Sequence, residues 1–234
     1  LIIESRNPPS LLGVGAIESI SDVAILTGAD PDDADGDGIS GRVRWLHDGH
    51  IGKLGWKAQI ATVNDFVADA LLQEIGVTIH PNLSDFTSED DFDVCEDPEL
   101  LTEDVTDLTF FIYELAPPKR EDGPSNVTFE TLGCASCHTP SLDSVELYSD
   151  LLLHDMGYDL STVVDHDSGL LPSEFRTAPL WGLRDTAPYM HDGSAETLFD
   201  AILHHGGEAE GSVAAFMNLT TAEQNDLIKF LQRL

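Results

Sequence analysis

Apolar residues recur at helical spacing in two similar segments of the chain. In residues 101–115 they fall on one helical face, after Thr102 as a candidate N-cap and an acidic first turn. These positions are Val105, Leu108, Phe111, Ile112 and Leu115. Residues 220–234 repeat the pattern, and a gap-free alignment pairs Thr102/Thr221, Asp107/Asp226, Leu108/Leu227, Phe111/Phe230 and Leu115/Leu234. Each segment is predicted to be the closing helix of a small domain.

Two further segments have an amphipathic pattern. Residues 65–75 carry an apolar stripe of Phe66, Ala70 and Leu71, and residues 197–205 place Leu198, Ile202 and His205 on one face. No convincing run of alternating apolar and polar residues indicates a strand. The pattern therefore predicts a mainly α fold with long loops.

A short motif occurs twice in matching order, which indicates an internal duplication. Arg6-Asn-Pro-Pro9 is followed by Gly13, and Arg176-Thr-Ala-Pro179 is followed by Gly182. Residues 116–124 are rich in helix breakers and charge, and read as a linker. We therefore expect two domains, 1–117 and 118–234.

Cys134-Ala-Ser-Cys137-His138 has the spacing that attaches haem c. Each thiol adds to one vinyl group of the porphyrin, and the histidine becomes the first iron ligand. A redox dithiol or a zinc site is the alternative, but zinc needs two more close-set ligands and the chain has no second cysteine pair. The third cysteine, Cys95, is either a buried apolar residue or the partner of a cysteine outside this chain.

The second iron ligand has several candidates after the haem motif. They are His154, Met156, Met190, His191, His204 and His205. His205 ends an apolar helical stripe just before Gly206-Gly207, which favours it as the residue that meets a buried ring. Two histidine ligands would give the iron a lower potential than one histidine and one methionine.

The chain is strongly acidic, with 43 Asp and Glu against 11 Lys and Arg, a net charge of −32. Such a surface repels phosphate backbones and excludes nucleic acid as a partner. A solvated surface in a salty medium is the favoured interpretation, and docking to a basic electron-transfer partner is the alternative. No apolar run is long enough to span a membrane. Leu1 is not an initiator and no export signal precedes it, so we expect a mature product or a fragment, and the duplication favours a fragment.

Several longer segments resemble the bacterial di-haem oxidoreductase (putative peroxidase) family along nearly the whole chain. After the haem motif these are residues 150–157, 174–182, 189–193 and 204–209; before it they are 6–13, 35–42 and 55–59. More distantly, the chain is similar to di-haem cytochrome c peroxidases and to the di-haem enzymes that mature methylamine dehydrogenase.

The resemblance implies two cytochrome c-like domains, each with its own haem motif. This chain lacks the first motif, so its first domain is expected to be incomplete and a second haem is expected in the full-length protein. In the related peroxidases the axial ligand of the C-terminal haem follows a Pro-Tyr-x-His-Asp-Gly segment by a stretch of helix. Carried onto this sequence, that ligand is His205, in agreement with the apolar stripe.

The resemblance also implies roles for three other residues. Glu74 resembles the acid that handles peroxide protons, since splitting the O–O bond needs a group that moves a proton; a solvated helix carboxylate is the alternative. Trp56 is either an electron relay between haems or a core tryptophan. Arg176 either binds a haem propionate through charge-assisted hydrogen bonds or forms an ordinary surface ion pair.

Asp33, Asp35 and Asp37 alternate before Gly38, as ligands do in calcium loops. Position twelve of such a loop should be a glutamate, but Arg44 stands there. Calcium bound between the domains of related peroxidases supports a calcium site here.

Three functions remain in view from the sequence. The first is an enzyme: the C-terminal part of a di-haem peroxidase-like oxidoreductase that relays electrons between a partner protein and a second haem where hydrogen peroxide reacts. The second is a six-coordinate electron-transfer cytochrome without substrate chemistry, and the third is a binding module with a simple dithiol. Because haem c is attached outside the cytoplasm, we expect a periplasmic or extracellular protein.

Overall fold

The fold is described from a computed structural model, which places residues 5–88, 93–124, 126–157, 160–162 and 169–234. The first half carries α1 (Val14–Ser19), α2 (Asp22–Gly28), α3 (Val63–Ile75) and α4 (Thr102–Tyr113). The second half carries α5 (Val127–Thr131), α6 (Cys134–Cys137), α7 (Leu198–Leu203), α8 (Glu210–Met217), α9 (Thr221–Leu231), the strands β1 (Leu153–Asp155) and β2 (Glu174–Arg176), and the 3-10 turns η3 (Leu183–Asp185) and η4 (Gly207–Ala209). The mainly α class is confirmed.

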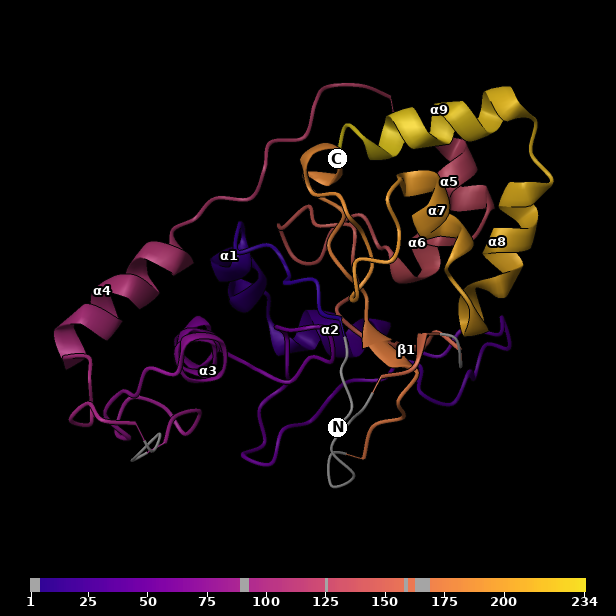
Figure 1. The fold of residues 1–234 in the computed structure, drawn as a ribbon. Coiled ribbons are helices and arrows are strands. Elements are labelled where there is room, and N and C mark those ends of the chain that lie inside the picture. The colour runs from indigo at the N-terminus through magenta and orange to yellow at the C-terminus, as the bar shows by residue number, and fades with distance from the viewer. Residues whose placement is uncertain (1–4, 89–92, 125, 158–159, 163–168) are drawn as a thin grey trace.

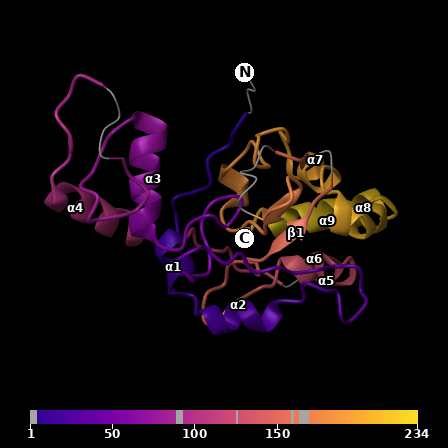
Figure 2. The same cartoon turned by 90° about the horizontal axis from the view of Figure 1, so that it is seen from below.

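Helices lie at both ends of the molecule and between them. In two perpendicular views α3 and α4 lie at one end and α7, α8 and α9 at the other, with α1, α2 and β1 between them (Figure 1, Figure 2). The segment that joins α4 to α5 arches over the molecule in Figure 1. Among the described residues, no helix combines the length and the apolar character needed to cross a membrane.

The four predicted helices are present as α3, α4, α7 and α9. The expectation that Thr102 caps α4 is wrong, because Leu101 occupies the N-cap position and no side chain accepts a hydrogen bond there. At α9, Thr220 and Glu223 form a capping box that satisfies two N-terminal amides.

A small antiparallel sheet was not expected from the sequence. β1 and β2 pair Leu153 with Arg176, His154 with Phe175 and Asp155 with Glu174. Each strand has three residues, too few for an alternating pattern to be recognised. The pairing brings His154 and Arg176, which are far apart in sequence, to one part of the molecule.

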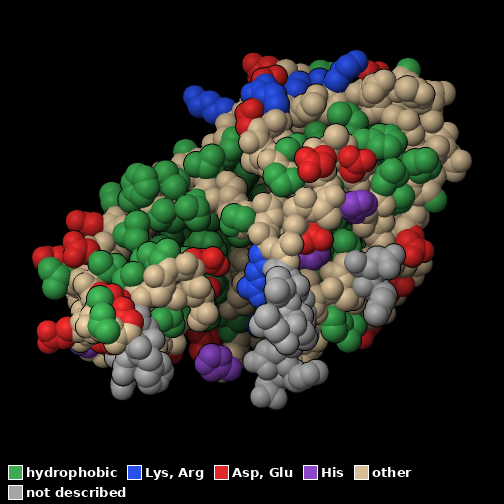
Figure 3. Space-filling model, in the orientation of Figure 1, with side chains coloured by type: hydrophobic (Ala, Val, Ile, Leu, Met, Phe, Trp, Pro, Cys, Tyr) green, Lys and Arg blue, Asp and Glu red, His purple; other side chains and the backbone are tan. Residues whose placement is uncertain are grey.

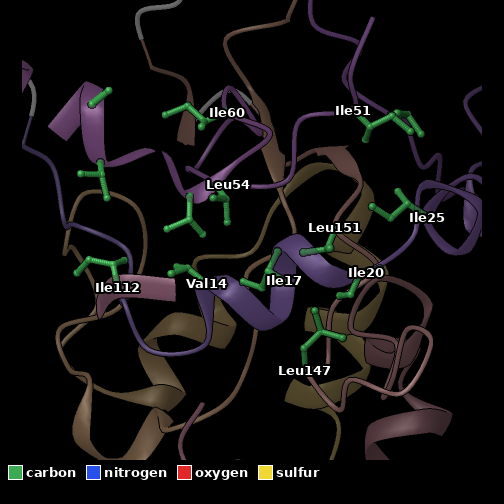
Figure 4. Close-up of a cluster of buried hydrophobic side chains, with 14 of the residues drawn as sticks. Val14, Ile17, Ile20, Ile25, Ile51, Leu54, Ile60, Ile112, Leu147 and Leu151 are labelled. Carbon is green, nitrogen blue, oxygen red and sulfur yellow. The ribbon is translucent and has the colours of Figure 1, made fainter. Parts of the chain in front are cut away.

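The larger buried core takes side chains from both halves of the chain. Val14, Ile17 and Ile112 pack in the same cluster as Leu147 and Leu151 (Figure 4). Trp181 belongs to this cluster as well, and its ring lies so close to Gly13 that a Cβ there would come within 2.5 Å. This core therefore contains residues from before and after residue 117. The division into two domains at that residue stays a prediction.

The second core surrounds α9 and is built from aromatic and leucine side chains. It contains Phe129, Tyr148, Leu198, Phe216, Leu227, Phe230, Leu231 and Leu234. Phe129 and Phe230 pack with ring centroids 5.4 Å apart. This cluster fixes α5, which leads directly into the haem motif.

Phe216 offers a direct test of the second core. Its side chain is 1% exposed, so Phe216→Ala is expected to lower the free energy of unfolding by about 3–5 kcal/mol, through lost burial and a residual cavity. Urea denaturation followed by circular dichroism measures the change. The neighbouring Met217 is 53% exposed, and Met217→Ala should change stability by less than about 0.5 kcal/mol. A similar loss in both variants would contradict this description of the core.

Five of the 11 basic side chains lie around the linker and α9, and we call this region the basic edge. It comprises Lys119, Arg120, Arg184, Lys229 and Arg233. Arg184 pairs with Glu121, whose backbone amide donates to the carbonyl of Arg233. Lys and Arg side chains accordingly gather along the upper edge in Figure 3.

Candidate functional site

The two motif cysteines lie on the single turn of α6. Gly133 enters this turn with φ of +85°, a left-handed conformation that glycine adopts without strain. The amide of His138 donates to the carbonyl of Cys134 at 2.9 Å. Burial raises the pKa of the Cys134 thiol to about 11. A reactive dithiol needs a lowered thiol pKa, so this environment does not suit dithiol exchange.

His138 and His205 face each other across a cavity beside these cysteines. Their ring centroids are 6.4 Å apart. His138 Nδ1 donates to the Tyr148 carbonyl at 3.0 Å, and His205 Nδ1 donates to the Ala201 carbonyl at 2.7 Å. Because each Nδ1 carries the hydrogen, each Nε2 keeps the lone pair that a metal ligand requires.

Both imidazoles are held in the neutral form. Burial, and then the nearby His205, lower the pKa of His138 to about 4. Burial also lowers the pKa of His205. A neutral ring is the form that binds a metal, so neither residue must lose a proton to act as a ligand at neutral pH.

The cavity has a volume of about 320 Å³ and takes its walls from both halves of the chain. Leu12 and Trp56 come from the first half, and Leu198, Ile202 and Phe216 from the second. The size lies within the usual range of cofactor pockets, and such pockets are mainly apolar.

The spacing of the two histidines tests whether a haem iron fits between them. Imidazole nitrogens bind metals at about 2 Å, so two rings that share one metal ion have centroids roughly 6 Å apart. The observed separation is 6.4 Å. The separation therefore suits His138 and His205 as the residues that would hold a haem iron.

His154 is built into an ion cluster and is not free to bind iron. Its Nε2 lies 2.9 Å from Asp150 Oδ2, and its Nδ1 lies 3.0 Å from Glu208 Oε2. The ring is 3% exposed. Burial alone would lower the pKa of His154, but hydrogen bonds to Asp150, Cys137 and Glu208 raise it to about 12.

The remaining candidate ligands fall into two groups. Met156, Met190 and His191 line the cavity, and His191 packs against Phe175 with ring centroids 4.4 Å apart. His204 is exposed and meets Ser194 Oγ at 3.3 Å.

The raised pKa of His154 predicts a pH dependence of stability. Below pH 6.5 the ring is protonated in both the folded and the unfolded chain, so its stabilisation is fully present. Between pH 6.5 and about 12 only the folded state keeps the proton, so the stabilisation falls as the pH rises. The slope is on the order of 1 kcal/mol per pH unit.

His154→Gln should remove this fall, whereas His50→Gln, at an exposed histidine 2.9 Å from Asp48, should retain it. Urea denaturation at about pH 7 and about pH 9 measures the difference. An unchanged pH dependence in His154→Gln would show that the ring is neutral in the folded protein.

Arg176 is buried on β2 beside the cavity. Its Nε donates to the Gly55 carbonyl at 2.8 Å, and its Nη1 donates to the Thr177 carbonyl at 3.1 Å. Burial lowers the pKa of Arg176 to about 10, although the negative charge of Asp150 acts to raise it. Within the described part of the chain no carboxylate forms an ion pair with this guanidinium, so the alternative of an ordinary surface ion pair is not seen there.

The resemblance implies roles for Glu74 and Trp56, and only Trp56 lines the cavity. Glu74 is exposed in the last turn of α3 and does not line the cavity, and its catalytic role stays a prediction. Trp56 is half-buried, donates from Nε1 to the Asn7 carbonyl at 2.7 Å and meets the His191 ring edge-on.

The predicted calcium loop gathers a partly different set of carboxylates. Oxygens of Asp30, Asp33 and Asp35 lie within 4.8 Å of one another. Asp37 lies outside this group and accepts the Ile39 amide at 2.8 Å. Asp30 was not identified from the sequence, because it lies before the alternating run. Calcium binding stays a prediction. The third cysteine, Cys95, lies in a separate loop and is exposed, so it is not a buried apolar residue.

Comparison with known proteins adds a family and several relatives. Residues 1–234 match the family described as "Di-haem oxidoreductase, putative peroxidase". "Cytochrome-c peroxidase IdrP2" of Pseudomonas sp. is 44% identical over 62 residues, which are 26% of this chain and 17% of the relative. "Methylamine utilization protein MauG" of Methylorubrum extorquens is 33% identical over 114 residues, which are 44% of this chain and 31% of the relative.

These matches cover about a third or less of the relatives' length. Among solved structures, a MauG-like protein associated with microbial copper homeostasis aligns with a TM-score of 0.48 and 17% identity, covering 100% of this chain and 94% of the other.

Proposed function

Because this chain belongs to the di-haem oxidoreductase family, we propose that it binds one haem c and serves as an electron-relay part of a peroxidase-like enzyme. Cys134 and Cys137 would form the two thioether bonds, and His138 and His205 would be the iron ligands. The observation that carries the proposal is the pair of facing imidazoles, 6.4 Å apart, each with Nε2 free for metal binding.

Each residue of the site has a distinct task. The Tyr148 and Ala201 carbonyls orient the two imidazoles and keep the proton on Nδ1. The apolar walls keep water away, and Arg176 offers a buried positive charge for a propionate, which is a charge-assisted pairing. When bound, the haem supplies one-electron redox chemistry.

The relay role also implies a second haem, a partner protein and two further sites. A relay with two fixed ligands needs a second haem where hydrogen peroxide reacts, and a partner protein that gives or takes electrons. Glu74 is the proposed proton-handling residue at that reaction, and Asp33, Asp35 and Asp37, with Asp30, form a proposed calcium site. Because haem c attachment takes place outside the cytoplasm, we place the protein in the periplasm or outside the cell.

A visible absorption spectrum tests the relay role. The haem-loaded chain is measured oxidised and reduced, before and after addition of hydrogen peroxide. A low-spin spectrum that peroxide leaves unchanged is expected, because both iron positions are then occupied. A high-spin component that peroxide converts would overturn the relay role and would make this haem the reactive one. A spectrum without a covalent haem band would overturn haem binding itself.

The alternative is an electron-transfer cytochrome with no substrate chemistry, which the same two imidazoles would also suit. Peroxide turnover by the protein loaded with both haems distinguishes the two functions. Turnover supports the enzyme, and its absence from a protein loaded with both haems supports the cytochrome.

A further inference from the structure

The ion cluster around His154 joins four separate parts of the chain. The backbone amide of Asp150 donates a hydrogen bond to the Cys137 carbonyl at 3.0 Å, and the Asp150 carboxylate accepts one from His154 Nε2. Glu208 lies on η4, just after His205, and meets the other side of that ring. Ser40, from the first half, donates its hydroxyl to Glu208 Oε1 at 2.6 Å. The cluster thus lies between the haem-attachment turn and the turn that follows the second ligand.

The geometry fixes the protonation state of the ring. A carboxylate oxygen faces each nitrogen of His154 within hydrogen-bond distance. Carboxylates only accept, so both nitrogens must donate and the ring is an imidazolium. A buried cation between two buried or half-buried carboxylates is a fixed charge, since breaking such a pairing leaves an uncompensated charge.

The cluster also meets the atom that would carry the porphyrin. His154 Nδ1 lies 3.6 Å from Cys137 Sγ, and His154 and Glu208 both line the cavity. We propose that His154 is a positioning residue that holds a positive charge beside the Cys137 thioether and thereby raises the reduction potential of the bound haem. This inference rests on the haem proposed above.

The sign of the effect follows from electrostatics. Reduction adds one negative charge to the haem, so a nearby cation favours the reduced state and a nearby anion opposes it. The charged groups around the ring are Asp150 and Glu208, with Arg176 on the adjacent strand. Removing the imidazolium leaves two carboxylates unbalanced, whereas removing one carboxylate leaves a more positive cluster.

Two variants with opposite charge changes test the proposal. Spectroelectrochemical titration of the haem-loaded chain measures the potential of His154→Gln, Glu208→Gln and His50→Gln. We expect His154→Gln to lower the equilibrium constant for reduction about tenfold, or about 59 mV, and Glu208→Gln to raise it by a similar factor. His50→Gln removes an exposed histidine at the same 2.9 Å distance from a carboxylate and should leave the potential unchanged.

The outcomes separate an electrostatic role from a structural one. A loss of packing alone would move both variants in the same direction, and that result, or no shift in either, would overturn the proposal. If His154→Gln does not fold, Glu208→Gln decides: a higher potential supports the proposal and an equal or lower one overturns it. A wild-type chain that carries no haem would instead be a failure of the proposed function.

Discussion

The double substitution Cys134→Ala with Cys137→Ala is expected to reduce covalently bound haem to background. The two sulfurs are the atoms that form the thioether bonds, and no other cysteine lies near the cavity in the described part of the chain. Each side chain is only partly buried and loses one sulfur atom, so the fold should persist. Acidified-solvent extraction followed by a haem absorbance measurement of the denatured chain checks this result.

Cys95→Ala is the matched control, because Cys95 is an exposed free cysteine in another part of the fold. It should leave the covalent haem content unchanged. Equal losses in this variant and in the double variant would mean that expression or maturation, rather than attachment, had failed. A wild-type chain whose motif cysteines form a reversible disulfide and hold no haem would favour the dithiol alternative.

His205→Ala is expected to convert the low-spin haem spectrum into a high-spin one while the haem stays covalently attached. The substitution removes the imidazole that faces His138, so one iron position becomes open. Added imidazole should restore the low-spin spectrum, because it supplies the missing ligand without the protein backbone. The absorption spectrum and the response to hydrogen peroxide both report the change.

His204→Ala is the control for this experiment, since His204 precedes His205 but is exposed. Its spectrum should match that of the wild type. If His205→Ala leaves the low-spin spectrum intact, a different cavity residue is the ligand. Met156 and Met190 line the cavity and would be the next to replace.

Four of the helices, and the residue that lies opposite His138, could be predicted because their sequence signals are local. Apolar spacing identified α3, α4, α7 and α9, and the position of His205 at the end of a stripe suggested the residue that faces His138. Such patterns depend on residues within a few helical turns of one another.

The ion cluster could not be predicted because its members meet only in three dimensions. His154 looked like one of several candidate ligands, and its partner Glu208 lies 54 residues away. Two strands of three residues hold the ring in place, and no alternating pattern reveals strands so short. One local signal was present, the spacing of four residues between Asp150 and His154, but without the loop geometry it does not indicate contact.

The basic edge makes the charge of this acidic chain uneven, because five of the 11 basic side chains share one region. The chain has a net charge of −32, yet Lys and Arg side chains gather along the upper edge in Figure 3. A cationic protein that approaches experiences a torque that turns the basic edge away, so encounters are biased toward the acidic surface. Salt shortens the reach of this field to about 8 Å at physiological ionic strength, and the bias weakens accordingly. For a cationic partner, this field would therefore bias the orientation of the first encounter before any side chains touch.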